Sequence, residues 1–135
     1  MRRPPNAWLW LAPCLACLTD GTVTFAGQRD VYWEGSYELA REDNPLARPL
    51  LALHPLAFGT GLMLEAATLA WIAGWWRLTL AIPAAVLATL GHATGIATWC
   101  ISLSGGSVAG WVVTVLVFVV AERVLHWTWP AARAV

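Results

Sequence analysis

Four long apolar stretches constrain this chain more than any other feature of its sequence. They cover approximately residues 7–26, 49–74, 78–103 and 107–127. Each stretch approaches the ~20 residues that an α-helix needs to cross the hydrocarbon core of a bilayer. Only residues 75–77 and 104–106 separate the last three stretches, and connections this short place consecutive helices antiparallel. The sequence therefore predicts an all-α membrane protein, a four-transmembrane-helix up-down bundle that forms a single membrane domain over residues 1–135.

The composition agrees with a chain that is surrounded by lipid. Hydrophobic residues make up 59% of the sequence and charged residues 12%, about half of the ~25% that is typical of a soluble domain. The ten Trp residues have amphipathic rings that favour the two membrane–water interfaces. The formal net charge is zero and no basic patch is present, which argues against nucleic acid as a partner. The lipid bilayer is therefore the expected partner, and other membrane subunits or a second copy of the chain are further candidates.

The first apolar stretch has a second interpretation. Arg2 and Arg3 precede it, and Thr24-Phe25-Ala26 is similar to the small-x-small site at which a signal peptide is cleaved. Cleavage there would leave a bundle of three helices. The stretch is long for a signal peptide, however, and Asp20 is out of place in the apolar part of one. We therefore expect the stretch to be retained as the first helix.

The distribution of arginine predicts how the bundle is oriented. With four spans, one end of the bundle carries Arg2, Arg3, Arg77, Arg123 and Arg133, and the other end carries Arg29, Arg41 and Arg48. Cytoplasmic ends carry the excess of basic residues. We therefore expect a multi-pass protein of the cell membrane, in a bacterial inner membrane, with both termini in the cytoplasm and the loop of residues 28–48 outside.

That outer loop has its own pattern. Trp33 and Tyr37 are four residues apart, which predicts a short helix lying in the membrane interface, and Pro45 predicts a helix boundary just before it. Four acidic residues also recur at intervals of four, namely Asp30, Glu34, Glu38 and Glu42. On a continuous helix they would form one acidic stripe, and Asp30, Glu34 and Glu38 would then be a docking surface for a partner. The alternative is a solvated loop in which Gly35 interrupts the helix.

Ionisable residues inside the apolar stretches are costly in lipid and usually face the interior of a bundle. Helical rise brings Asp20, His54 and His92 to neighbouring depths, with Glu42 at the mouth of the outer loop. Carboxylate and imidazole ligands of this kind suit a divalent transition metal such as Zn, Fe or Mn. No H-E-x-x-H or comparable ligand spacing is present, so hydrogen-bonded packing roles for the histidines are the alternative.

A second polar group is expected nearer the cytoplasmic end. It comprises Glu65 and Glu122, with His126 on the same helical face as Glu122, and Arg77 and Arg123 as counter-ions. Glu65 and Glu122 could form an intramembrane relay for protons. His126 lies among interfacial Trp residues, where we expect water to reach it.

Small residues predict close packing between helices. Gly91 and Gly95 are four apart, as are Gly106 and Gly110, and this spacing lets two helix backbones approach closely. The Cys14-x-x-Cys17 spacing could indicate a redox or metal site, but both residues lie in an apolar stretch, where buried Cys behaves as a small hydrophobe. We therefore interpret both features as packing.

Two short motifs in the first half of the chain resemble a known pattern. Asp20-Gly-Thr-Val-Thr24 and Glu42-Asp-Asn-Pro45 are similar to the D-x-x-x-T and E-x-N-P motifs of a family of small uncharacterised prokaryotic membrane proteins. The longer outer loop and His54-Pro55 depart from that pattern. The resemblance implies that Asp20, Glu42 and Asn44 are functional positions, and it implies no chemistry, because the family has no settled activity.

Three functions are compatible with these observations. The close-packing glycines and the absence of a recognisable catalytic motif favour an accessory or scaffold subunit of a membrane complex, or a homo-oligomer. A membrane-embedded metal site or enzyme built on Asp20, Glu42, His54 and His92 is the first alternative. A proton or ion pathway that includes Glu65 and Glu122 is the second.

Overall fold

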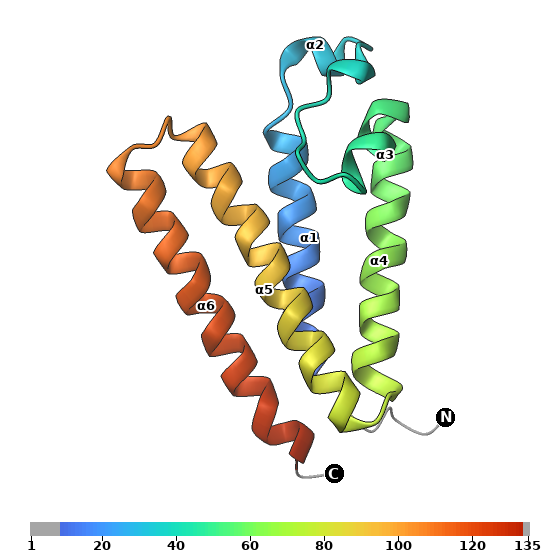
Figure 1. Cartoon of the computed structure of the whole chain (residues 1–135), viewed down its shortest axis with the longest axis vertical. Coiled ribbons are helices and arrows are strands. Elements are labelled where there is room, and N and C mark those ends of the chain that lie inside the picture. The colour runs from blue at the N-terminus through green and yellow to red at the C-terminus, as the bar shows by residue number, and fades with distance from the viewer. Residues whose placement is uncertain (1–8, 134–135) are drawn as a thin grey trace.

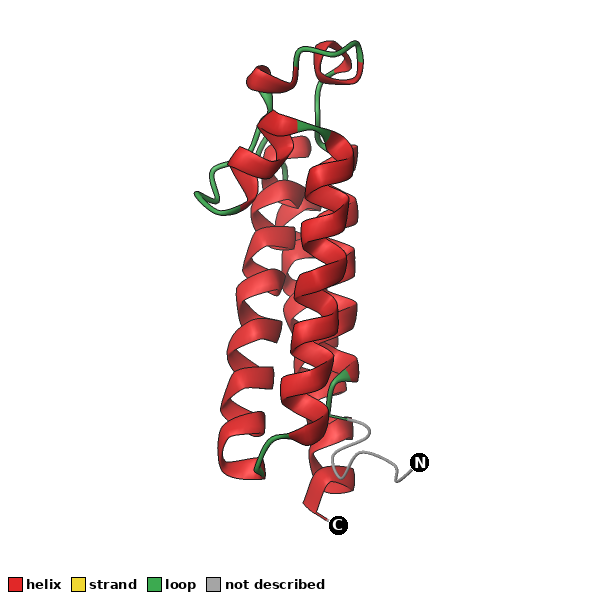
Figure 2. Ribbon diagram, turned by 90° about the vertical axis from the view of Figure 1, so that its right-hand side faces the viewer, coloured by secondary structure: helices red, strands yellow, loops and turns green. Residues whose placement is uncertain are grey.

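The computed structural model describes residues 9–133, and within them the side chains as far as residue 123 together with that of His126. Arg2, Arg3 and the first residues of the first predicted helix lie outside the described residues, as does the side chain of Arg133. The described residues form helices joined by turns and loops and contain no strand (Figure 2). The predicted all-α class is confirmed.

Four long helices run side by side and alternate in direction (Figure 1). They are α1 (Leu11–Ala26), α4 (Pro55–Trp75), α5 (Leu78–Leu103) and α6 (Val108–Arg133). Helix α5 packs against the other three, and α1 also packs against α4 and α6. The turn between α5 and α6 contains Gly105 and Gly106 at φ 62° and 75°, a left-handed conformation that glycine adopts without a steric cost. The helices α2, η1 and α3 all lie at one end of the bundle, which we call the loop end (Figure 1).

The second predicted helix is wrong as a single element, because the chain breaks it at His54. Helix α3 covers Ala47–Leu53, and α4 begins at Pro55. A residue before proline is driven away from helical geometry, and His54 has an extended backbone at φ −175° and ψ 146°. Its Nδ1 accepts a hydrogen bond from the amide of Leu56 at 3.0 Å, so His54 caps α4.

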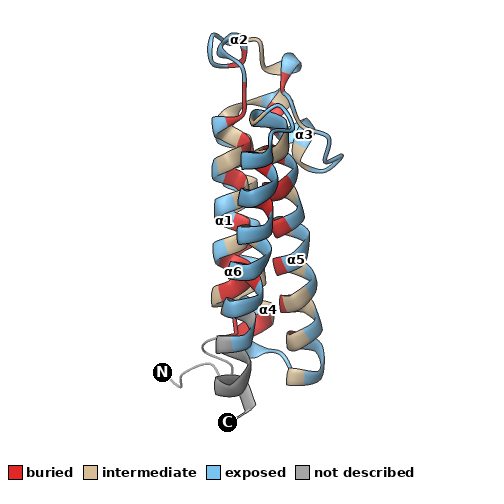
Figure 3. Cartoon of the chain, turned by 90° about the vertical axis from the view of Figure 1, so that its left-hand side faces the viewer, coloured by how far each residue is buried: buried red, intermediate tan, exposed pale blue. Residues whose placement is uncertain are grey.

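Many of the buried residues in the long helices are small, and many of the exposed ones are large and apolar. Figure 3 marks the buried and exposed positions along each helix. In α5 the buried positions include Ala81, Ala85, Thr89, Ala93 and Ala97. Leu87 of the same helix is 72% exposed, Met63 of α4 is 62% exposed and Val115 of α6 is 60% exposed. This is the reverse of the usual pattern in soluble domains, where large aliphatic side chains fill the core.

The outer loop does not form one continuous helix. Helix α2 covers only Asp30–Trp33, and Gly35 follows it at φ 109°, a conformation that ends the helix before η1 (Tyr37–Leu39) begins. The four acidic residues therefore do not form one stripe, and the alternative interpretation, a loop in which Gly35 interrupts the helix, is confirmed. Tyr32 is buried, and its hydroxyl donates to the Leu51 carbonyl at 3.2 Å, which fastens the loop to α3. Burial raises the pKa of the Tyr32 hydroxyl.

Two of the long helices, α4 and α5, are long and apolar enough to cross a membrane. Helix α1 is apolar but has only 16 residues in the described part of the chain. The end of α6 carries side chains that lie outside the described set. Two of the four predicted spans are thus supported, those of α4 and α5.

His54 provides a direct test of the break between α3 and α4. We expect His54→Ala to lower the free energy of unfolding by about 1 kcal/mol, because the Leu56 amide loses its acceptor. His54→Asn should retain most of the stability, since an asparagine side chain also caps helices. Unfolding curves of the purified protein in mild detergent would measure both. Equal stability of His54→Ala and the parent chain would mean that the cap contributes nothing.

Candidate functional site

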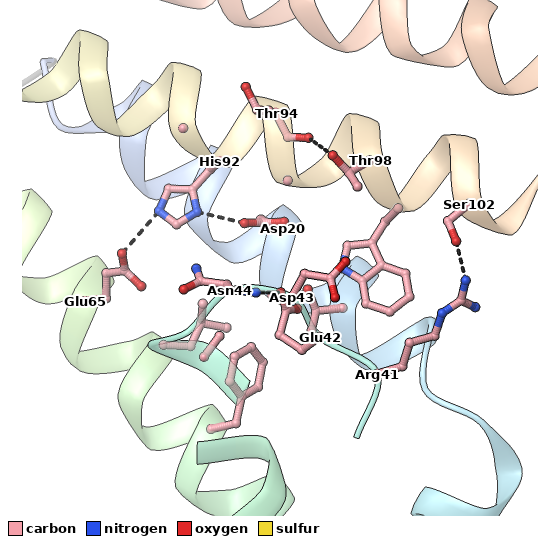
Figure 4. Close-up of a pocket in the computed structure, with 18 of the residues that line it drawn as sticks. Asp20, Arg41, Glu42, Asp43, Asn44, Glu65, His92, Thr94, Thr98 and Ser102 are labelled. Atoms are coloured by element: carbon pink, nitrogen blue, oxygen red, sulfur yellow. Dashed lines mark hydrogen bonds and ion pairs between the residues drawn. The ribbon is translucent and has the colours of Figure 1, made fainter. Parts of the chain in front are cut away.

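A cavity of about 530 Å³ lies between α1, α4 and α5, and the segment that leads into α3 lines it on the loop side (Figure 4). Its lining is unusually polar for so apolar a chain. Four carboxylates contribute to it, together with one guanidinium, one imidazole and several hydroxyl groups. The ionisable residues are Asp20, Arg41, Glu42, Asp43, Glu65 and His92.

A cluster of three side chains in the wall of this cavity joins three helices. His92 of α5 places Nδ1 2.9 Å from Asp20 Oδ2 of α1 and Nε2 3.4 Å from Glu65 Oε1 of α4. Figure 4 shows the His92 ring between the two carboxylates. The His92 and Asp20 side chains are 16% and 21% exposed, whereas that of Glu65 is 53% exposed. The three residues form one network, which we call the Asp20–His92–Glu65 triad.

Gly95 explains why α1 and α5 can approach closely enough for this contact. A Cβ atom at Gly95 would lie 2.5 Å from Asp20 Oδ1, closer than such atoms can be. Gly91, one turn earlier, faces open space, with no atom within 4 Å of the Cβ position. Of the two glycines in the predicted small-x-x-x-small pattern, Gly95 therefore makes a close contact between helices of this chain, and Gly91 does not. Both glycines line the cavity.

Cys17 lies on the same face of α1 as Asp20, three residues earlier. It is fully buried, and its Sγ lies with a Glu65 carboxylate oxygen and a His92 ring nitrogen in a group whose atoms are all within 4.8 Å of one another. Both thiols also face carbonyl groups of α4, Cys14 that of Ala66 at 3.3 Å and Cys17 that of Leu62 at 4.0 Å. The two cysteines of the C-x-x-C spacing differ in that Cys17 also lies near Glu65 and His92, whereas Cys14 keeps the packing role that the sequence predicts for both.

The segment Arg41 to Asn44 is fixed over the cavity by Gln28. The Gln28 side chain is buried, and its amide nitrogen donates to the carbonyls of Thr24 and Arg41 at 3.0 and 2.9 Å. Its amide oxygen accepts from the Arg41 backbone N–H at 2.8 Å. A single side chain therefore satisfies both backbone groups of Arg41 and ties the segment to the end of α1.

Side chains of this segment complete the wall of the cavity. The Arg41 guanidinium lies 5.5 Å from the Trp99 ring centre and donates to the Ser102 hydroxyl of α5. Glu42 accepts from the Asn44 amide at 2.8 Å, and the Asn44 side chain accepts from the Leu46 amide at 2.9 Å, which shapes the turn before α3. Asp20, Thr24, Glu42 and Asn44, the polar residues of the two short motifs, all line the same cavity.

The predicted metal set is thus only partly brought together. Asp20, Glu42 and His92 line one cavity, and Asp20 contacts His92 directly. His54 does not line it, because its Nδ1 is engaged in capping α4 and its ring packs 5.0 Å from that of Tyr37. The inclusion of His54 assumed an unbroken helix through Pro55, and the break removes it from the set.

The predicted relay of Glu65 and Glu122 is also regrouped. Glu65 belongs to the triad near Asp20, whereas Glu122 is exposed on α6 and pairs with Arg123 at 3.5 Å. His126 is exposed as well. Asp30, Glu34 and Glu38, the predicted docking residues, are exposed on the loop end and do not line the cavity.

Gln28 and Arg41 are site residues that the sequence did not single out, and Cys17 was interpreted there as a packing residue. The regrouping of Glu65 could have been found from helix boundaries. Glu65 lies ten residues after the start of α4, and His92 lies eleven residues before the end of α5. At 1.5 Å per residue both are about 15–17 Å from the loop end, so they share one level.

Comparison with known proteins adds no relative to this description. No family model matches the chain, and no curated protein or solved structure matches it either. The resemblance carried by the two short motifs therefore remains a proposal.

Gly95 and Gly91 form a matched pair for testing the triad. We expect Gly95→Ala to displace the Asp20 carboxylate and to destabilise the protein by about 1–3 kcal/mol, the usual cost of overpacking. Gly91→Ala adds the same methyl group to the same helix without a clash, so it should be neutral or stabilising by up to ~1 kcal/mol. Unfolding curves in detergent would measure the difference, and equal stability of the two variants would contradict the close contact.

Gln28 tests whether the Arg41–Asn44 segment is tied to α1. Gln28→Ala leaves the Arg41 N–H and C=O without their partner, which should cost about 1–3 kcal/mol for each group that water cannot reach. Gln28→Glu retains the acceptor for the N–H but loses the donor, so its effect should be intermediate. Amide hydrogen exchange at residues 41–44 would report the release, and unchanged protection in Gln28→Ala would show that other contacts hold the segment.

Proposed function

We propose that this chain is a multi-pass integral membrane protein that binds a small cation in a polar cavity between its helices. The observation that carries the proposal is the Asp20–His92–Glu65 triad, which joins three helices at the wall of an acidic cavity. An accessory or scaffold subunit, which the sequence alone favoured, would not need such a cavity. The regrouped polar residues therefore favour ligand binding.

The membrane environment is supported by the reversed burial pattern. Lipid tails are as apolar as leucine, so membrane helices associate through small residues and turn large apolar side chains outward. Gly110, Thr114 and Ala121 form the buried seam of α6, whereas Val115 and most of its other described residues are exposed. An apolar surface this extensive would be an aggregation hazard in water.

Exposed tryptophans support the same environment at both ends of the bundle. Trp33 and Trp111 lie near the loop end, and Trp71, Trp75 and Trp76 lie near the opposite end. Two such groups are typical of aromatic belts at the two membrane interfaces. We therefore extend the proposal from α4 and α5 to four spans. Arg77 and Arg123 lie toward the end opposite the loop, which favours that end as the cytoplasmic side.

Charge indicates the class of ligand. Four carboxylates and one guanidinium, that of Arg41, line the cavity. The guanidinium already interacts with the Trp99 ring and the Ser102 hydroxyl, so it offsets the carboxylate charge only in part. In a site of low dielectric constant, such an excess of negative charge attracts cations and rejects anions. Glu42 and Asp43 lie in the segment over the cavity, where they would meet an entering ligand first.

Spin labels placed on outward residues would test the membrane proposal. In a cysteine-free background, Leu87→Cys and Val115→Cys should carry labels that are accessible to oxygen and shielded from a water-soluble nickel reagent in lipid vesicles. Ser36→Cys in the loop should give the opposite result. Nickel accessibility at residue 115 together with oxygen accessibility at residue 87 would exclude α6 as a span, and nickel accessibility at both would exclude the membrane proposal.

Ligand-dependent stability would test the cavity. We expect purified protein in detergent to be stabilised by at least one cation from a panel of Mg²⁺, Zn²⁺ and methylammonium, and not by inorganic phosphate. Saturation at 100 times the dissociation constant corresponds to ~2.7 kcal/mol. Glu42→Gln should weaken cation binding about tenfold, equivalent to ~1.4 kcal/mol.

Glu34→Gln is the matched control for Glu42→Gln, because Glu34 carries the same charge in the same loop and does not line the cavity. It should leave cation binding unchanged. Equal effects of the two variants would indicate general electrostatics of the loop and would contradict a role for the cavity.

A further inference from the structure

We propose that a transition-metal site of the Zn²⁺ class lies at the wall of the cavity, with Cys17, Glu65 and His92 as ligands and Asp20 as the residue that orients His92. The inference rests on the proposed cation-binding function and names the ion and its ligands. It differs from the set predicted from the sequence, because it gains Cys17 and Glu65 and loses Glu42 and His54. Asp20 changes from a ligand to the residue that orients His92.

The spacing of the three ligand atoms fits a metal ion. Cys17 Sγ, a Glu65 carboxylate oxygen and a His92 ring nitrogen all lie within 4.8 Å of one another. In a tetrahedral zinc site with bonds of about 2.0–2.3 Å, neighbouring ligand atoms are about 3.3–3.7 Å apart. The 3.4 Å between His92 Nε2 and Glu65 Oε1 is already in this range. A small shift of side chains would complete the site.

Asp20 fixes which nitrogen of His92 is free. An Nδ1–H that donates to Asp20 Oδ2 over 2.9 Å leaves the lone pair on Nε2, the atom that faces Glu65. A carboxylate behind a ligating histidine is a common arrangement in metal sites, where it sets the tautomer and raises the basicity of the ligand. Gly95 makes room for this carboxylate, so the backbone of α5 contributes to the orientation.

The chemistry of the ligand set favours zinc over a hard cation. A thiolate and an imidazole are ligands for Zn²⁺ and for other divalent transition metals such as Co²⁺, whereas Mg²⁺ and Ca²⁺ prefer oxygen ligands alone. One thiolate and one carboxylate also neutralise the two charges of the ion, which lowers the cost of burying it. Three protein ligands leave the fourth position open, and because Glu65 and His92 line the cavity, that position would face it.

Cobalt provides a readout that depends on the thiolate itself. The full-length protein, purified in mild detergent and stripped with a chelator, is titrated with Co²⁺ and separately with Zn²⁺. We expect one equivalent of each to bind, and Co²⁺ to give the near-ultraviolet absorption of a cobalt–thiolate bond. Cys17→Ala should lose this absorption. Cys14→Ala is the matched control on the same helix, and it should retain the absorption.

The other variants separate ligands from the orienting residue. His92→Ala and Glu65→Gln should each abolish stoichiometric metal binding. Asp20→Asn should bind one equivalent with affinity lowered about 10–100-fold, the usual effect of removing a partner behind a metal ligand. Unfolding curves of the metal-free variants provide the check that each one folds.

Three results would overturn the site. Cobalt bound to the parent protein without thiolate absorption would remove Cys17 from the set, and this result needs no variant to fold. Absence of transition-metal binding, with Mg²⁺ or methylammonium still stabilising the protein through Glu42, would leave the cavity intact and the metal assignment wrong. Failure of every cation to bind would overturn the proposed function as well.

Discussion

The contact between Asp20 and His92 is the interaction on which the arrangement of the bundle depends. It joins α1 to the central helix α5, and through Nε2 of His92 it reaches α4 as well. Removing Asp20 would leave the His92 ring N–H without its acceptor, and an unsatisfied polar group that water cannot reach typically costs about 1–3 kcal/mol. The contact requires glycine at residue 95, because a Cβ atom there would collide with the Asp20 carboxylate. The polar contact and the close packing of α1 against α5 therefore depend on each other.

The polar interior and the apolar exterior are consequences of the same physical setting. If lipid surrounds the helices, as we propose, burial of large apolar side chains gives no advantage between helices, and small residues let the backbones approach. Polar side chains in such helices then face the interior of the bundle. The cavity between α1, α4 and α5 collects them, and the described residues contain no buried side-chain nitrogen or oxygen that lacks a hydrogen-bond partner. The backbone of the segment over the cavity is hydrogen-bonded as well. Arg41 lies outside the helices, and the Gln28 side chain bonds both its N–H and its C=O.

How far the sequence predicts this structure depends on the distance between the residues that interact. Helices α5 and α6 begin within one residue of the expected positions, because glycine and tryptophan-rich turns mark their ends locally. The break at His54 was equally local, since a residue before proline resists helical geometry, but the apolar run through Pro55 concealed it. That one error displaced the estimated depth of Glu65 and produced a false partner in His54. Arg41 was not singled out, and Cys17 was interpreted as a packing residue, for another reason. Their roles depend on contacts across 61 and 75 positions of the chain, to Ser102 and His92, and no spacing rule predicts such contacts.

The contrast between Cys14 and Cys17 shows how a motif can mislead in both directions. As a C-x-x-C pair the two residues indicate a shared redox or metal site, and as residues of an apolar helix they indicate simple packing. Neither interpretation applies to both residues. Side chains three positions apart lie on the same face of a helix but differ by about 4.5 Å in height along its axis. Cys14 faces the Ala66 carbonyl of α4 and Cys17 the Leu62 carbonyl one turn away, and of the two it is Cys17 that lies near Glu65 and His92. The ligand set that we propose therefore comes from one member of the motif and from two other helices, a combination that only the packing of α1 against α4 and α5 brings together.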